Sequence, residues 1–356
     1  MSNEVSENIE TSASKDVYQC PRTGASLSVQ GDSLVSDDGS VSYEMKRGVP
    51  FFLNDYVPEP DKIKDQLEQV NELAREKHWK EAVKDVYGDW DYIFPDGRDE
   101  WLKLLEIDSD DDVLEIGPGM GQFSPLISKR CNTLHGLEVV PEQAEFATER
   151  CRQEGCTNMQ FASGGDDCLL PYKDNSFDWV VLNLVFEWCA MRNDQGTDFA
   201  SGQRTMLSEM NRVLKPGGKL YLLTKNRYAL RLMTGKHDEH CYGMKFGNSL
   251  PRPIMNFLLR RKGKSHPRGM LHSHNALKGM FKDAGFESVE SFWATPEMRF
   301  PTDCVPNNPA AIRAARKRPG FVQGEFKSTR MMMRWIPAGL VKHFTPGLQM
   351  IAQKRG

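Results

Sequence analysis

The sequence predicts an α/β protein in which a mostly parallel sheet follows a small β-rich module. From about residue 106 onward, strand-like and helix-like apolar patterns alternate, which is typical of a parallel sheet connected by helices. Between residues 17 and 57, short apolar pieces are instead separated by Gly, Ser and Asp. That pattern is typical of short strands joined by tight turns.

The composition places the chain among globular proteins. Hydrophobic residues make up 39 % and charged residues 27 % of the chain. No apolar run approaches the roughly 18 residues that a membrane span needs. The polar, acidic start lacks the features of a secretory signal, and the eight cysteines are scattered, as expected for free thiols. We therefore expect a cytoplasmic protein with no membrane span.

The charge is distributed unevenly along the chain. Residues 1–115 hold 12 Lys/Arg and 28 Asp/Glu, whereas residues 241–356 hold 20 Lys/Arg and 6 Asp/Glu. This asymmetry predicts either attraction between the two ends or an anionic partner for the basic end. A solvated basic surface is the simpler alternative.

The order of patterns along the chain predicts its domain organisation. Apolar residues recur at three- and four-residue spacing over 61–86, which indicates helix, and a further helix is expected from about Asp99 to Glu106. The segment after the fifth strand is too long for an ordinary connection. The predicted parts are a disordered tail (1–15), the β-rich module (16–57), a helical extension (58–105) and the main domain (106–356) with inserts at about 225–274 and 301–346.

A glycine-rich turn opens the main domain. Val113 to Ile116 form a short apolar strand, and Gly117, Gly119 and Gly121 follow it. Glycines suit a backbone that turns sharply against a ligand, although the G-x-G-x-G spacing differs from the dinucleotide fingerprint. The next strand ends in Glu138, an acidic residue placed to accept hydrogen bonds from both hydroxyls of a ribose.

Two later segments carry a more specific resemblance. Gly165, Asp166, Leu170, Pro171 and Tyr172 follow the pattern G-D-x-x-x-L-P-[FY], and Ser176, Phe177 and Asp178 precede an apolar strand. The segment EMNRVLKPGGKLYLLT then supplies a helix, a turn and a fifth strand. Together with the glycine turn and Glu138, in this order, these elements resemble the class I S-adenosylmethionine-dependent methyltransferases.

The resemblance implies a fold, a cofactor and a set of binding residues. The fold is a Rossmann-like, seven-stranded, mostly parallel sheet with helices on both faces, and the cofactor is S-adenosyl-L-methionine. Asp166 would bind the adenine amino group, the Asp167 backbone amide would meet the ring, and Asn183 would lie at the cofactor mouth. Arg98 would reach the methionine carboxylate or form a surface salt bridge. The predicted cofactor-binding residues are Glu115, Gly117, Gly119, Gly121, Glu138, Asp166, Asp167, Asn183 and Arg98.

The β-rich module carries a second resemblance. CPRTGASL, beginning at Cys20, and DGSVSYEMKRGVPFFL, ending at Leu53, resemble the small activator domain that partners several tRNA, rRNA and protein methyltransferases. That family descends from a zinc ribbon, but Cys20 has no second cysteine nearby, so we predict no metal. A chance β-rich cap is the alternative. A module of this size buries too little to be stable alone, so we expect it to dock through Phe51, Phe52 and Leu53.

Methyl transfer from a sulfonium is a direct displacement, and a base is needed only if the acceptor must lose a proton. We predict His240 as that base, oriented by Asp238, and Glu187, just past the fourth strand, as a second catalytic candidate. A zinc site from His237, His240 and Cys241 is a weaker alternative, and each histidine alone is more often a surface residue. The candidates lie in the 225–274 insert, which contains Lys225, Arg227, His237, Asp238, His240, Arg268, His272 and His274.

The insert also resembles a bacterial subgroup that accompanies glycan or secondary-metabolite pathways, through Asn226-Arg227, Asp238-x-His240 and Pro296 to Pro301. We therefore expect a small-molecule or glycan acceptor more than a nucleic acid. The alternative is an RNA or protein methyltransferase that uses the basic C-terminal third. Against it, the fourth strand ends in Asn-Leu-Val-Phe and not in the Asn-Pro-Pro-Tyr type of signature. A non-catalytic binding module and the transfer of another group are further alternatives.

Overall fold

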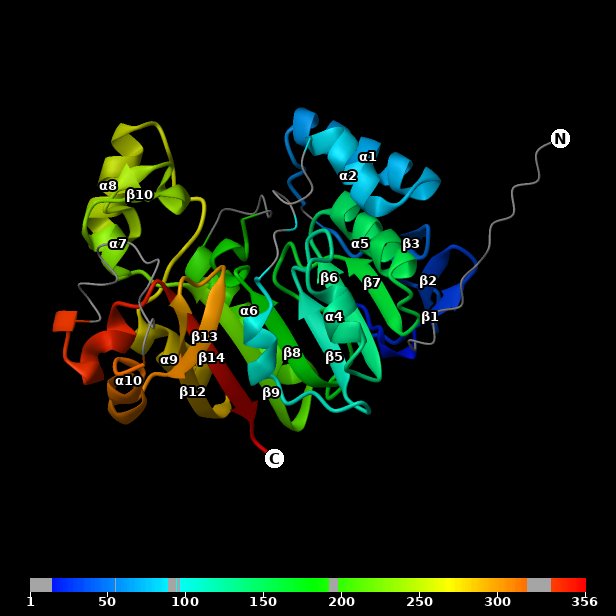
Figure 1. Ribbon diagram of the computed structural model, residues 1–356. Helices are drawn as coiled ribbons and strands as arrows, with labels where there is room; N and C mark the ends of the chain where they lie inside the picture. Colours follow the sequence, from blue (N-terminus) through cyan, green and yellow to red (C-terminus); the bar gives the residue numbers. More distant parts are fainter. Residues whose placement is uncertain (1–14, 55, 89–93, 95–96, 192–197, 319–333) are drawn as a thin grey trace.

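The computed structural model describes residues 15–54, 56–88, 94, 97–191, 198–318 and 334–356 (Figure 1). The predicted disordered tail lies outside the described residues except for Lys15. No helix of the described chain is both long and apolar enough to cross a membrane.

A large sheet of eight strands forms the centre of the molecule, in the order β13-β12-β14-β9-β8-β5-β6-β7. Strands β5 to β9 run parallel, and β14 is antiparallel to both β9 and β12. The strands are β5 (Asp112–Ile116), β6 (Thr133–Glu138), β7 (Met159–Ser163), β8 (Phe177–Asn183), β9 (Leu214–Lys225), β12 (Phe286–Pro296), β13 (Pro301–Pro306) and β14 (Gly347–Lys354).

The expectation of seven strands is corrected to eight. The additional strand is β13, which lies at the start of the predicted 301–346 insert. After β12 the chain reverses direction, and β13 pairs antiparallel with β12 from Phe292–Pro306 to Pro296–Pro301. The insert therefore extends the sheet at one edge.

Alternate residues of the central strands face opposite sides of the sheet and build two hydrophobic cores. One side is packed by α6, α9 and the N-terminal module, and the other by η2, α4 and α5, so the sheet is covered on both faces. The first core takes Leu114, Ile116, Val180, Leu182, Leu220 and Leu222, and the second takes Val113, Trp179, Val181, Tyr221 and Leu223. This two-residue period is what a sheet buried on both faces requires.

The helices connect the strands and extend the fold at both ends. The predicted helix at Asp99 to Glu106 is a shorter 3-10 helix, because Leu105 is extended and ends it. The helices are α1 (Asp61–Glu76), α2 (Trp79–Tyr87), α4 (Ser124–Ser128), α5 (Pro141–Gln153), α6 (Phe199–Val213), α9 (His274–Asp283) and α10 (Pro309–Ala315), with the 3-10 helices η1 (Lys15–Val17), η2 (Glu100–Leu104), η3 (Phe186–Trp188) and η6 (Ala338–His343).

The N-terminal module is a four-stranded antiparallel sheet docked on the main domain. It contains β1 (Leu27–Gln30), β2 (Ser33–Ser36), β3 (Ser42–Lys46) and β4 (Val49–Pro50). The amide of Phe52 donates to the carbonyl of Ser163 at 2.7 Å, beside the edge strand β7. The ring of Tyr18 stacks on Tyr172 at 5.4 Å between centroids, inside the shared core. Of the three residues predicted to make this contact, Phe52 is buried in the shared core, whereas Phe51 and Leu53 are only half-buried.

The long segment after β9 forms a separate lobe (Figure 1). We call residues 226–268 the insert lobe. It stands apart from the large sheet, opposite α1 and α2 in the view of Figure 1. The lobe contains α7 (Leu230–Met233), β10 (His237–Asp238), η4 (Glu239–Cys241), β11 (Met244–Lys245), η5 (Gly247–Ser249) and α8 (Arg252–Arg261).

Candidate functional site

The glycine turn lies between β5 and α4 and leaves room for a ligand against the backbone. Gly117 has φ +69°, and a Cβ placed on it would collide with Val185. Gly121 has φ +75°, and its Cβ would lie 3.1 Å from the Cβ of Ala147 in α5. Only glycine adopts this conformation without strain. The sequence-predicted glycines therefore close the turn against α5 and the segment after β8.

Glu138 ends β6 directly beside this turn. Its Oε2 accepts a hydrogen bond from the Gly119 amide at 2.8 Å, and its Oε1 accepts one from the Val140 amide at 3.1 Å. Burial raises the pKa of Glu138, and the two amide bonds oppose that rise. Because each carboxylate oxygen has a second lone pair, the group can still accept hydrogen bonds from a ligand.

A cavity of about 320 Å³ opens beside Glu138. Its far end is formed by Asp166, which is buried and accepts a hydrogen bond from the Asn54 amide at 3.3 Å. Asn54 leaves the N-terminal module, and Glu59 also lines the cavity, so the junction of module and main domain completes this site. The lining residues used below are Gly117, Gly119, Glu138, Gln143, Asp166 and Trp188.

Asp167 does not line this cavity. Its carboxylate lies 3.4 Å from the guanidinium of Arg22 in the module, and its Oδ1 accepts from the Leu169 amide at 3.1 Å. Asp166 therefore faces the cavity, whereas the carboxylate of Asp167 is turned toward the module. The expected contact of the Asp167 backbone amide with the adenine ring stays a prediction.

A second cavity of about 550 Å³ continues from the first past Gly117, Val185 and Trp188. Arg98, Glu115 and Asn183 line it, as the sequence predicted for the cofactor site. Glu115 accepts a hydrogen bond from the Ser124 hydroxyl at 2.6 Å, and burial raises its pKa to about 7. The second cavity is therefore lined by both a buried acid, Glu115, and a basic side chain, Arg98.

Arg98 points into this second cavity from the loop before η2. Its Nη1 donates to Gln122 Oε1 at 2.6 Å, and its guanidinium lies 5.6 Å from the centre of the Phe123 ring. Burial lowers the pKa of Arg98. The alternative, in which Arg98 forms a surface salt bridge, is not found: within the described part of the chain, Arg98 forms no ion pair.

A third cavity, of about 330 Å³, lies under the insert lobe and shares Lys225, Glu239 and Arg299 with the second. Lys225 is the last residue of β9, and it forms ion pairs with Glu239 and, at 3.7 Å, with Glu187. Burial acts to raise the pKa of Glu239, but the ammonium of Lys225 lowers it below its usual value. The other lining residues are Arg231, Leu232, His237, Asp238, His240, Leu271, Glu297 and Phe300.

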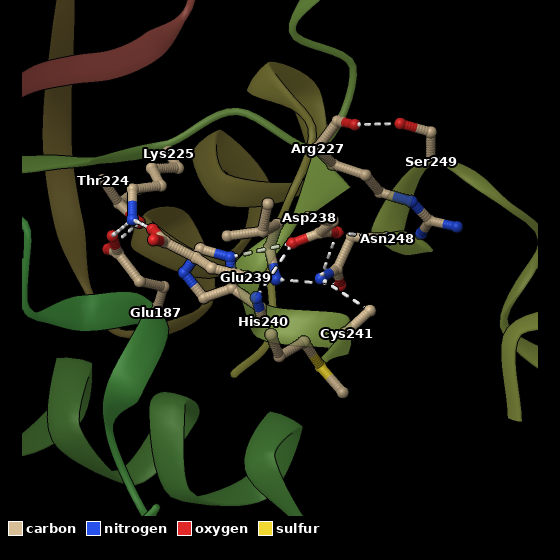
Figure 2. A network of polar contacts seen from close by, with 12 residues as sticks. Glu187, Thr224, Lys225, Arg227, Asp238, Glu239, His240, Cys241, Asn248 and Ser249 are labelled. Atoms are coloured by element: carbon tan, nitrogen blue, oxygen red, sulfur yellow. Dashed lines mark hydrogen bonds and ion pairs between the residues drawn. The ribbon is translucent and has the colours of Figure 1, made fainter. Parts of the chain in front are cut away.

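Asp238 and His240 form the pair expected from the sequence (Figure 2). Asp238 Oδ1 lies 3.0 Å from His240 Nδ1, and Oδ2 accepts from the Asn248 amide at 2.7 Å. Burial acts to raise the pKa of Asp238, but the bonds from His240 and Asn248 lower it. A carboxylate only accepts, so Nδ1 carries a hydrogen and Nε2 presents a lone pair. Within the described residues, Nε2 is buried without a hydrogen-bond partner.

The expectation that Glu187 faces the acceptor is corrected. Its side chain is 0 % exposed and does not line any of the three cavities. Its Oε2 accepts a hydrogen bond from the Thr224 hydroxyl at 2.6 Å (Figure 2). Its carbonyl accepts a hydrogen bond from the Met270 amide. The segment that follows the lobe packs against η3, and the Glu187 side chain points into the interior. There Glu187 forms an ion pair with Lys225 and so helps to position that side chain.

Several cavity residues were not singled out from the sequence, namely Glu59, Gln143, Trp188, Glu239 and Arg299. Trp188 could have been found, because it follows the carboxyl end of β8, where ligands bind in such sheets. The ring of His240 lies 4.4 Å from that of Trp188. Glu59 and Arg299 approach from distant parts of the chain and carry no local signal.

The remaining polar residues of the insert have other partners. His272 Nε2 lies 2.6 Å from Gln203 Oε1, and His274 Nε2 lies 3.1 Å from the Ser291 hydroxyl. Cys241 Sγ lies 3.7 Å from Met255 Sδ, away from a shared centre with His237 and His240. Among the described residues, no group of three or more His, Cys, Asp or Glu side chains is arranged to hold a metal ion.

Comparison with known proteins identifies the domain that carries this site. Residues 114–222 match the family model described as "Methyltransferase domain". The chain is 27 % identical over 188 residues to the ubiquinone/menaquinone biosynthesis C-methyltransferase UbiE of Francisella tularensis subsp. tularensis, covering 51 % of this chain and 68 % of the relative. It is 25 % identical over 202 residues to the demethylmenaquinone methyltransferase of Oceanobacillus iheyensis, covering 54 % and 76 %.

Among solved structures, the YcgJ protein from Bacillus subtilis is similar at 16 % identity and a TM-score of 0.40, over 72 % of this chain and 96 % of that one. The segment that matches the family model runs from β5 through the glycine turn to β9, and it contains Glu138, Asp166 and Asn183. The family match and the two sequence relatives show that residues 114–222 form a methyltransferase domain, whose cofactor is S-adenosyl-L-methionine.

Proposed function

We propose that the protein transfers a methyl group, by direct in-line displacement, to a small-molecule or glycan-type acceptor bound between the glycine turn and the insert lobe. The observation that carries this proposal is the continuity of the three cavities. The first contains Glu138 and Asp166, the second contains Glu115 and Arg98, and the third lies beyond Lys225 under the lobe. One molecule can therefore lie along the turn while a second approaches from the lobe.

The residues of the first two cavities fit S-adenosylmethionine. The carboxylate of Glu138 is preorganised by two backbone amides and suits the ribose hydroxyls. Gly117 and Gly119 line the first cavity, where backbone without a Cβ can lie directly against a ligand. Arg98 brings a cation and Glu115 a buried, hydrogen-bonded acid to the second cavity, and these groups suit the carboxylate and ammonium groups of a methionine.

The cofactor supplies a methyl group on a sulfonium, which a nucleophile attacks directly. The protein must hold the acceptor in line and exclude water. Trp188 and Val185 line both cofactor cavities, and Lys225, whose ammonium lies 5.4 Å from the centre of the Trp188 ring, lines the second and third cavities. These residues are therefore placed to align the two substrates.

His240 is the proton acceptor in this proposal. Asp238 holds Nδ1 and leaves the lone pair of Nε2 free of protein partners. When an acceptor O–H or N–H attacks, the new bond to the methyl carbon forms as the bond to sulfur breaks, and the proton moves to Nε2. Asp238 stabilises the imidazolium that results.

The acceptor class is supported by the relatives and by the size of the third cavity. The two sequence relatives are named for quinone biosynthesis, so their acceptors are small molecules. The third cavity, of about 330 Å³, suits a small molecule or a terminal sugar. Its mixture of Lys225, Arg231 and Arg299 with Glu239 and Glu297 favours a more polar acceptor group than a bare hydrocarbon.

Transfer of radiolabel from S-adenosylmethionine tests the proposal. The small-molecule, RNA and protein fractions of an extract from producing cells are offered separately, and label is expected in the small-molecule fraction. His240→Gln should lower the turnover number about 10²- to 10⁴-fold and leave cofactor affinity unchanged. His78→Gln, at an exposed histidine that lines none of the three cavities, is the matched control and should retain activity. Label in RNA, with binding that weakens steeply with salt, would instead establish the alternative acceptor class.

A further inference from the structure

The insert lobe carries a strongly positive surface. Glu239 is its only exposed acidic side chain among residues 226–268, all of which the structure describes, and it is paired with Lys225. The exposed basic side chains of the lobe are Arg231, Lys236, Lys245, Arg260, Arg261, Lys262, Lys264 and Arg268. This concentration of charge accounts for much of the basic character of the C-terminal third.

Large apolar side chains are exposed among these charges. On α8, Met255 and Leu259 face the interior of the lobe, whereas Ile254 is 49 % and Phe257 59 % exposed. Ile254, Phe257 and Arg261 are spaced i, i+3 and i+7, so they lie on one outward face of the helix. The guanidinium of Arg261 lies 5.7 Å from the centre of the Phe257 ring.

A second exposed apolar pair lies nearer the acceptor cavity. Met233 is the last residue of α7, and Gly235 follows it by two positions. The ring of Phe246 packs next to Gly235, and the side chains of Met233 and Phe246 are both exposed. Phe246 has φ +63°, a conformation uncommon for a bulky residue. Leu232 and His237, which flank this region in sequence, line the third cavity. The exposed apolar residues therefore continue toward the acceptor site.

We propose that the insert lobe binds the surface of an anionic phospholipid bilayer. Exposed Phe and Ile side chains on a short amphipathic helix insert at the boundary between headgroups and acyl chains. Surrounding Lys and Arg side chains are attracted to the negative surface. The proposal goes beyond the methyl-transfer function and does not depend on it, although it places the third cavity beside the bilayer, where an amphiphilic acceptor is concentrated.

The charge distribution favours a bilayer over other occupants. A self-complementary contact between the lobes of two copies would bring the same eight cations face to face, and like charges oppose such an interface. Nucleic acid would satisfy the cations but would leave Ile254 and Phe257 exposed to water, since phosphate contacts dominate that type of binding. An anionic bilayer satisfies both kinds of side chain at once.

Vesicle sedimentation with the full-length protein tests this proposal. Binding is expected to vesicles of phosphatidylcholine with phosphatidylglycerol, and much less to phosphatidylcholine alone. The partition coefficient should fall at least tenfold for the variant Ile254→Ser/Phe257→Ser. It should also fall at least tenfold for the separate variant Arg260→Gln/Arg261→Gln/Lys262→Gln. It should also fall when salt rises from about 0.1 M to about 0.5 M, because exposed charges are then screened.

Matched controls lie elsewhere on the surface. Val29→Ser/Leu340→Ser removes two side chains that are 41 % and 47 % exposed and that line none of the three cavities, and Lys62→Gln/Lys64→Gln/Lys84→Gln removes three exposed cations of α1 and α2. Both should bind vesicles like the unchanged protein. S-adenosylmethionine affinity, measured by calorimetry, should be unchanged in all four variants.

Four results would each overturn the proposal: no binding to anionic vesicles, equal binding to neutral vesicles, equal losses in the control variants, or a dimer in sedimentation velocity that Ile254→Ser/Phe257→Ser dissociates. Because cofactor affinity and methyl transfer are measured in solution, loss of vesicle binding alone leaves the proposed function intact.

Discussion

Glu138→Gln isolates the contribution of one carboxylate to cofactor binding. The substitution keeps the shape of the side chain and removes its charge. At present both oxygens accept from amides, at 2.8 and 3.1 Å. Glutamine has one accepting oxygen, so its NH₂ group must face either the Gly119 or the Val140 amide, and one buried donor is left without an acceptor.

The cost can be worked from these contacts. An unsatisfied buried donor costs about 1–3 kcal/mol, and bonds to a charged acceptor contribute about 1.5–3 kcal/mol. Part of the first cost is paid in the free protein and does not affect binding. We therefore expect a loss of about 2 kcal/mol in binding free energy, which is roughly a thirtyfold weaker Kd for S-adenosylmethionine.

Isothermal titration calorimetry with S-adenosylmethionine and S-adenosylhomocysteine measures this change. Glu142→Gln is the matched control, because Glu142 lies on α5 close by and does not line the cavity. A thermal melt of each variant separates weaker binding from unfolding. If Glu138→Gln stays folded and binds as tightly as the control, Glu138 does not contact the cofactor and the reasoning fails.

Two further predictions concern stability. Phe52→Ala should lower the free energy of unfolding by about 3–5 kcal/mol, because the ring is buried against Tyr18 in the core shared by module and main domain. Phe51 is more exposed, so Phe51→Ala should lower the free energy of unfolding far less in the same denaturant titration. Equal losses for the two variants would contradict the docking argument. Burial lowers the pKa of His135 to about 4, so the unfolded chain binds the extra proton between about pH 6.5 and 4, and this group lowers stability by about 3 kcal/mol as the pH drops through the range. Burial lowers the pKa of His272 and His274 to about 4 as well, so His135→Phe should reduce the pH dependence by roughly a third, whereas His237→Phe, at the surface, should leave it as it is.

The cofactor end of the site was predictable because its residues follow strands that are adjacent in sequence. A short apolar strand followed by Gly117, Gly119 and Gly121 predicts both the turn and its closeness to a ligand. Glu138 ends the next strand, and parallel strands bring their carboxyl ends to one edge of the sheet. Local patterns were thus sufficient to place the turn, Glu138 and Asp166 around one cavity.

The acceptor end was predictable only in part. The spacing of Asp238 and His240 predicted a pair that the structure contains, since two residues in one short turn have few ways to face each other. The direction of Glu187 was not predictable, because the Met270 amide that binds its carbonyl comes from 83 positions further along the chain. Arg299 reaches the cavity only through the reversal between β12 and β13.

The sequence alone determined the α/β class, the parallel core, the glycine turn and the uneven charge, because each depends on residues close together in the chain. Tertiary structure decided the eighth strand, the inward turn of Glu187 and the exposure on α8. Ile254, Met255, Phe257, Leu258 and Leu259 make that helix apolar on most of its circumference. Which of them meets water depends on what packs against the helix, and that packing buries Met255 and Leu259 and leaves Ile254 and Phe257 at the surface.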